Sequence, residues 1–122
     1  MTTETEGQAT SEMGSRISRG LVNLYKKYTG RGPSHARTHV HDDVVVTVLS
    51  GTMTHAEQTL KQEDREEMVR EQRRVFQDAF RKEAIALAEQ ITGRGVVAFL
   101  SDHAVDPDYA VEVFVFAPDG DV

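Results

Sequence analysis

Apolar residues recur at steps of three and four over residues 11–29, which places them on one face of a helix. They are Met13, Ile17, Leu21, Leu24, Tyr25 and Tyr28. Gly30 is a typical helix end, and Pro33 prevents the helix from continuing. Residues 1–10 are acidic and polar and contain almost nothing apolar, so we expect a disordered tail there.

The next two segments have the pattern of strands. Residues 36–41 alternate small or apolar residues with Arg and His, which predicts a strand with one solvent-facing side. A turn follows at Asp-Asp, and residues 44–50 are β-branched almost throughout, which favours a more central strand. Two later strands are predicted over 96–101 and 110–116, and the segment between them, with its Asp-Pro-Asp, is expected to form a loop.

Two helices are predicted between these strand pairs. Thr54 and Glu57 have the spacing of a capping box, in which each side chain binds the other residue's backbone amide. This helix is short because the chain becomes wholly polar at 61–64. Asp64 is expected to cap a second helix in the same way, and that helix runs over 64–92 and ends at Gly93.

The sequence Thr-Gly-Arg-Gly occurs at 29–32 and again at 92–95, each time after a helix and before a strand pair. The copies are either two chance helix ends or the marks of an αββ unit used twice. A phosphate-binding role is disfavoured, because helix C-termini repel anions. Strands so close in sequence form antiparallel hairpins. The order αββ-ααββ predicts one α+β domain over 11–118, followed by a tail at 119–122. We expect a mainly antiparallel four-stranded sheet with two main helices packed on one face. The order of the strands in the sheet is not determined by the sequence.

Composition narrows the functional classes. The 122 residues suit one domain, and the net charge of −6 argues against nucleic-acid binding. There is no cysteine, so disulfides and thiolate chemistry are excluded. The N-terminus lacks the pattern of a signal peptide, and the longest apolar runs are about six residues against the ~20 of a membrane helix. We expect a cytoplasmic protein without direct membrane insertion.

Histidine and aspartate side chains near the strand ends are the candidate metal ligands. His39 and His41 share a strand face, Asp42 follows directly, and His103 comes from the later strand pair. The alternative is that these residues only form an exposed strand face and a turn. We favour this alternative, because the spacing of the residues matches no metal-binding signature in detail. No catalytic residue and no cofactor is expected. A further possibility is a small-ligand or anion sensor at the strand–helix junction 51–57.

Several short motifs in order resemble the MpsC-like domain family. They are Gly-Pro at 32–33, His-Asp-Asp-Val-Val-Val at 41–46, Leu-Ser-Gly-Thr-Met-Thr-His-Ala-Glu at 49–57, and Ser-Asp at 101–102. Met53 stands where the family usually has Leu. The resemblance covers about residues 12–117 and implies a component of a Na⁺-translocating, membrane-potential-generating system. It carries over no catalytic or ligand residue.

Two readings of function follow. The first is a non-enzymatic accessory or regulatory module that binds a protein partner in a membrane transport complex. The alternative is a small metal- or ligand-binding enzyme or sensor that uses the His- and Asp-rich strand ends.

The predicted helix over 64–92 also suggests a homodimer. It would be roughly 43 Å long, whereas a domain of this size is about 35 Å across. The only large apolar residues in its N-terminal half are Met68 and Val69, which stand among charged residues of both signs. These charged residues form either a solvated helix face or a surface that binds a partner. A second copy could cover the overhang. The alternative is a break near 64–67, which would leave a monomer.

Overall fold

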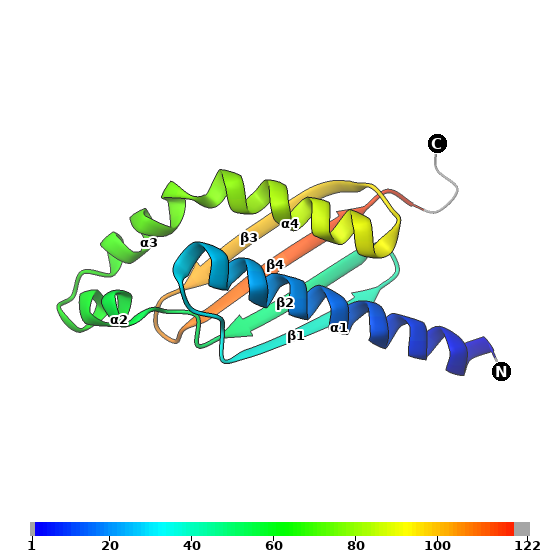
Figure 1. Ribbon diagram of the computed structural model, residues 1–122, viewed down its shortest axis with the longest axis horizontal. Coiled ribbons are helices and arrows are strands. Elements are labelled where there is room, and N and C mark those ends of the chain that lie inside the picture. The colour runs from blue at the N-terminus through cyan, green and yellow to red at the C-terminus, as the bar shows by residue number, and fades with distance from the viewer. Residues whose placement is uncertain (1, 119–122) are drawn as a thin grey trace.

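The computed structural model describes residues 2–118, with side chains from residue 10 onward. The elements are α1 (Thr2–Thr29), β1 (His35–His41), β2 (Val44–Ser50), α2 (His55–Gln62), α3 (Glu66–Val75), α4 (Gln77–Thr92), β3 (Val96–Ala104) and β4 (Tyr109–Phe116). Figure 1 shows α1 and α4 side by side on one face of the sheet, with α2 and α3 reaching beyond one of its ends. This is the α+β architecture and element order that the sequence predicts.

The four strands lie in the order β1-β2-β4-β3, and every neighbouring pair is antiparallel. β1–β2 and β3–β4 are hairpins, and the two hairpins join through β2 and β4 at the centre. β3 continues to Ala104 and β4 begins at Tyr109, so the connection between them is shorter than the predicted loop.

The Thr-Gly-Arg-Gly copies end α1 and α4 with the same local structure. Gly30 and Gly93 have φ of 82° and 70°, a left-handed conformation that glycine adopts without strain. In each copy the threonine hydroxyl donates to the carbonyl oxygen four residues earlier, at 2.7 Å. Each glycine amide also donates to the carbonyl oxygen four residues earlier, at 2.9 and 2.8 Å. The repeated sequence therefore marks an αββ unit used twice in one sheet.

The main core fills the space between the sheet and the α1–α4 layer. Inward residues alternate along each strand, because successive side chains of a strand point to opposite faces. The buried apolar members are Ile17, Leu21, Tyr25, Val45, Leu49, Phe80, Ala84, Ala88, Phe99, Ala110, Phe114 and Phe116. A second, smaller cluster of Met53, Val69 and Val105 holds α3 against the end of the sheet.

The first helix starts earlier than the apolar pattern predicts. It begins at Thr2 rather than at residue 11, so the structure carries the helix through the segment where we expected a disordered tail. Nothing in residues 2–10 breaks a helix outright, and acidic residues near a helix N-terminus interact favourably with its dipole. The domain division at residues 10 and 11 stays a prediction. The predicted tail at 119–122 lies outside the described residues.

The predicted single helix over 64–92 is wrong, because the chain forms two helices separated at Phe76 (Figure 1). Phe76 has φ −107° and ψ 9°, and its ring stacks on that of Tyr28 with centroids 5.7 Å apart. The break turns α3 so that Val69 is buried against the end of the sheet. Tertiary packing thus overrides a continuous helical pattern. The N-terminal part of the predicted helix still reaches beyond the sheet, as α3, and the dimer through this helix stays a prediction.

Asp64 is not a helix cap. Arg65 occupies the N-cap position of α3 and makes no side-chain capping bond. Asp64 instead has φ 58°, a left-handed conformation that Asp tolerates better than most residues. It sits in the tight turn that closes α2, where the Arg65 amide donates to the Leu60 carbonyl oxygen at 2.7 Å.

Candidate functional site

The candidate metal ligands lie in two separate places. His39 and His41 are exposed on β1, and Asp42 is in the turn that follows. His41 Nε2 lies 3.5 Å from Asp42 Oδ2, with both side chains in solvent. His103 pairs with Ala110, near the opposite end of the sheet. Within residues 2–118, no group of three potential ligands gathers around one point.

A buried ion pair connects α2 to α3. Arg73 Nε donates to Glu57 Oε2 at 2.7 Å, and Arg73 Nη2 donates to Glu57 Oε1 at 2.9 Å. Glu57 is 2 % exposed, and it also accepts the Thr54 amide at 2.9 Å in the predicted capping box. Arg73 Nη2 donates as well to the Thr52 carbonyl oxygen at 3.1 Å. The fork of one guanidinium therefore fastens α3 to the start of α2.

The polar network continues into the β3–β4 connection. The Thr52 hydroxyl donates to Asp108 Oδ1 at 2.7 Å, and the Met53 amide donates to Asp108 Oδ2 at 2.8 Å. His103 Nε2 lies 3.1 Å from Thr52 Oγ1 and 3.2 Å from Asp108 Oδ1. Because both oxygens can accept, this nitrogen carries the ring proton of a neutral His103. We call Thr52, Glu57, Arg73, His103 and Asp108 the Arg73 cluster.

The neighbouring groups determine which members of the Arg73 cluster are ionised. Burial opposes ionisation of Glu57 and Asp108, but hydrogen bonds from Arg73, Thr52 and backbone amides hold the pKa of both carboxyls below their ordinary values. Burial, assisted by the charge of Arg73, lowers the pKa of His103, against the opposing effect of Asp108. The cluster thus contains two carboxylates, one guanidinium and a neutral imidazole at neutral pH.

A second buried pair lies beside the cluster. The Tyr25 hydroxyl donates to Glu112 Oε2 at 2.6 Å, and the Arg73 guanidinium sits over the Tyr25 ring at 5.9 Å from its centroid. Glu112 is 0 % exposed. Burial raises its pKa to about 7, although the hydroxyls of Ser101 and Tyr25 and the charge of Arg73 oppose the shift. This carboxyl therefore takes up or releases a proton near neutral pH.

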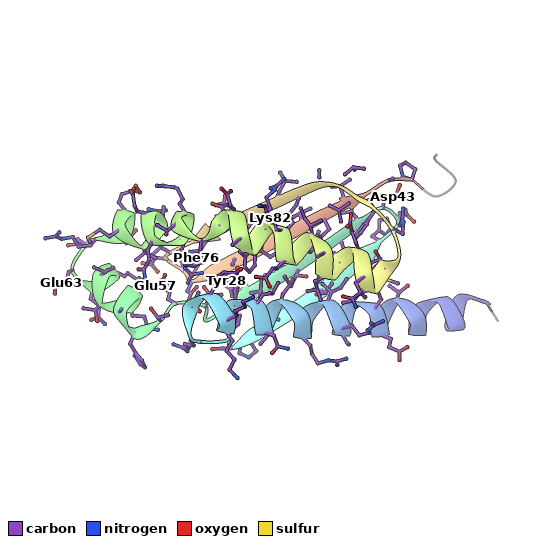
Figure 2. The ribbon with its side chains drawn as sticks, turned by 45° about the horizontal axis from the view of Figure 1, so that its top comes forward. Tyr28, Asp43, Glu57, Glu63, Phe76 and Lys82 are labelled. Atoms are coloured by element: carbon purple, nitrogen blue, oxygen red, sulfur yellow. The ribbon has the colours of Figure 1, made fainter. Side chains whose placement is uncertain are left out.

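A cavity of about 180 Å³ opens next to these two features. Its walls come from the end of α1, the α3–α4 break and β3. Figure 2 shows Tyr28 and Phe76 facing each other where α1 meets the break, with Glu57 on α2 nearby. Three guanidiniums, each of which already pairs with a glutamate, and four aromatic rings contribute to the walls. They are Arg70, Arg73, Arg74, Tyr25, Tyr28, Phe76 and Phe80.

Sequence reasoning identified part of this region. The junction 51–57, singled out as a possible sensor, supplies Thr52 and Glu57, and His103 was a metal candidate. It missed Arg73, Tyr25 and Glu112. Glu112 could have been found from the sequence, because it stands at an inward position of β4 between Ala110 and Phe114. An acidic residue at such a position indicates a buried and partnered carboxyl.

Comparisons with known proteins place the chain in a family. Residues 9–118 match the family model described as "Na+-translocating membrane potential-generating system (MpsC)". The uncharacterized protein YrhF of Bacillus subtilis (strain 168) is 30 % identical over 98 residues, which cover 79 % of this chain and 80 % of that protein. No solved structure matches significantly. Within residues 2–118, none of the helices has the length and apolarity that a membrane span requires. Because the family model covers nearly all of the domain, the chain belongs to the MpsC family.

Proposed function

We propose that this chain is a non-enzymatic accessory or regulatory subunit of a Na⁺-translocating membrane-potential-generating system, in which it acts by binding a protein partner. The observation that carries the proposal is the family match over residues 9–118, whose description names that system. The family description links the chain to the system as a whole, and the role within it is our inference.

The geometry of the Arg73 cluster supports a role without catalysis. Most of its polar groups are paired: Glu57 occupies the fork of Arg73, and Thr52 and Asp108 occupy Nε2 of His103. The other ring nitrogen of His103, Nδ1, is buried without a hydrogen-bond partner. Thr52 is 1 % exposed and its hydroxyl already donates to Asp108, so this hydroxyl is poorly placed as a nucleophile. Groups paired in this way hold α2, α3 and the β3–β4 connection in one arrangement, as a protein-binding module requires.

The test is affinity purification of the tagged chain from mildly solubilised membranes of its native host. We expect a multi-span subunit of the Na⁺-translocating system to co-purify in stoichiometric amount. Removing the chain should also lower the Na⁺-dependent membrane potential measured with a voltage-sensitive dye, and re-expression should restore it.

The control variant in this experiment is Lys82→Ala. Lys82 is an exposed residue on α4 (Figure 2), so its replacement should leave co-purification of the partner unchanged. Absence of any stable partner, combined with turnover of a small molecule by the purified chain, would overturn the proposal.

A further inference from the structure

The sheet face opposite the helices carries a continuous apolar surface. Strand side chains alternate, so the positions between the buried residues of β2 and β4 point away from α1 and α4. All but two of these positions on the central strands are valines, and Leu100 extends the surface onto β3. The apolar members are Val44, Val46, Val48, Val111, Val113, Val115 and Leu100. We call this surface the open face.

No described element covers the open face, because α1 and α4 both lie on the other side (Figure 1). Leu100 is 57 % exposed, and Tyr109 at the end of β4 is 50 % exposed. A sheet face in contact with water normally alternates to polar residues. A valine-rich face of this extent is typical of a surface that binds another molecule.

Two charged residues of opposite sign lie on the two edges of the open face, and β1 also contributes His35, His39 and His41 to it. β1 contributes Arg37 at one edge, and β3 contributes Asp102 at the other. The strand registers place Arg37 beside Val48, Val48 beside Val111, and Val111 beside Asp102. The two charges therefore stand in the same row, on opposite sides of an apolar centre.

We infer that the open face binds a second copy of this chain, with the two sheets packed face to face around a twofold axis that runs parallel to the strands between β2 and β4. That axis places β1 of each copy over β3 of the other and keeps each row in register. Arg37 then faces Asp102 of the other copy, and the pair forms twice. The valines of the central strands meet each other in the middle.

The other in-plane axis, perpendicular to the strands, is disfavoured by charge. It would place Asp102 over Leu100 of the other copy, and Arg37 over His39. Each copy would bury a carboxylate against an apolar side chain and leave a guanidinium without a partner, which is costly. Charge complementarity thus selects one of the two symmetric arrangements.

The size of the open face suits a modest but specific dimer. Four strands at ~4.8 Å spacing and seven residues at ~3.4 Å give a face of roughly 19 Å by 24 Å, or about 450 Å². Two such faces, with the relief of their side chains, bury about 1,000 Å², which is just below the roughly 1,200 Å² of stable interfaces and typical of weaker ones. Sheets that pack face to face keep their strand directions within about 30° of each other, as this axis requires, and their inner side chains interdigitate. The inference does not depend on the proposed function.

The first experiment measures mass by light scattering and sedimentation equilibrium up to about 100 μM. We expect wild type to sediment as a dimer of the 13.6 kDa chain. Val46→Asp should weaken dimerisation at least tenfold while the circular dichroism spectrum stays native. Val75→Asp is the matched control, since Val75 is an exposed apolar residue on α3 and its replacement should leave the dimer intact. A wild-type monomer throughout, or a dimer that Val75→Asp disrupts and Val46→Asp does not, would overturn the inference.

A charge exchange tests the symmetry. Arg37→Asp alone and Asp102→Arg alone should each weaken dimerisation about tenfold, because each places like charges face to face in both pairs. The double variant restores opposite charges between copies and should recover the wild-type dissociation constant. Within one chain the two residues are three strand spacings, ~14 Å, apart, so recovery cannot come from a contact inside the monomer. Failure of the double variant to recover overturns this arrangement. A monomeric wild type that loses a membrane-system subunit on Val46→Asp would assign the open face to a different partner.

Discussion

At the scale of single residues, the cost of burying charge makes the Arg73 cluster depend on each of its members. Glu57 is almost fully buried, and the side chain of Arg73 is 13 % exposed. An ion pair in such a place repays its desolvation only with good geometry and further hydrogen bonds, and this pair has both. Removing one partner leaves the other buried without compensation.

We therefore expect Arg73→Ala to lower the free energy of unfolding by about 3–5 kcal/mol, measured by urea denaturation at pH 7. The control is Arg74→Ala, whose partner Glu71 is exposed and 3.6 Å away, and it should cost under about 1 kcal/mol. In a Glu57→Gln background the cost of Arg73→Ala should shrink. An equal cost in both backgrounds would show that the two residues are not coupled.

Glu112 predicts a pH dependence of the opposite sign to that of ordinary paired carboxyls. Its pKa is about 7 in the folded chain and 4.5 in the absence of the fold, so between these values the folded state holds a proton that the unfolded state has released. Stability from this group is therefore present below pH 4.5 and falls by on the order of 3 kcal/mol as pH rises to 7. The neighbours facing it are Tyr25, Ser101 and Arg73.

Glu112→Gln removes this titration while keeping an acceptor for the Tyr25 hydroxyl. As the pH rises from 4.5 to 7, the unfolding free energy of Glu112→Gln should increase relative to that of the wild type. Urea titrations at several pH values measure it. A difference that stays constant across this range would show that Glu112 does not titrate there.

At the scale of elements, α2 is short, and its start is fixed by one hydrogen-bonded pair. Thr54 Oγ1 accepts the Glu57 amide at 3.2 Å, and the Glu57 carboxylate accepts the Thr54 amide. Two amides that have no partner within the helix are thereby satisfied. Because Glu57 also binds Arg73, the cap connects the start of α2 to α3.

Thr54→Ala should lower the free energy of unfolding by about 1 kcal/mol, because the Glu57 amide loses its acceptor. Thr59→Ala is the control in the same helix, since the Thr59 side chain is exposed and makes only a local bond to the His55 carbonyl oxygen. Chemical denaturation of both variants measures the effect. An equal effect of the two replacements would argue against the cap.

At the scale of the whole molecule, stability is unevenly distributed. β2 and β4 are hydrogen-bonded on both sides and lie under α1 and α4. The α2–α3 region reaches beyond the sheet and rests on the small cluster of Met53, Val69 and Val105 (Figure 1). Regions with few buried apolar contacts open at lower free energy than the central strands of a core.

Native-state hydrogen exchange should therefore show the slowest amides in β2 and β4 and much faster exchange in α2 and α3. Arg73→Ala should speed exchange in α2 and α3 more than in the central strands, because it removes the ion pair that joins these two helices. Uniform protection across all elements, or exchange in β2 as fast as in α3, would contradict this picture.

The sequence by itself determined the kinds of element, their order and the repeated αββ unit. These properties follow from local patterns: a period of 3.6 residues in α1, alternation in β4, and glycine with threonine at two helix ends. The capping box of Thr54 and Glu57 was predictable for the same reason, since both partners lie within one turn. Such features need no knowledge of distant parts of the chain.

Only the tertiary structure decided the strand order, the break at Phe76 and the composition of the Arg73 cluster. β2 and β4 pair although α2, α3, α4 and β3 lie between them in the sequence. Phe76 departs from helical geometry where its ring stacks on that of Tyr28 in α1. Glu57 and Arg73 are 16 residues apart, and Tyr25 and Glu112 are 87 apart. The physical reason is that partners so distant in sequence are brought together by burial of the common core, which no local pattern encodes.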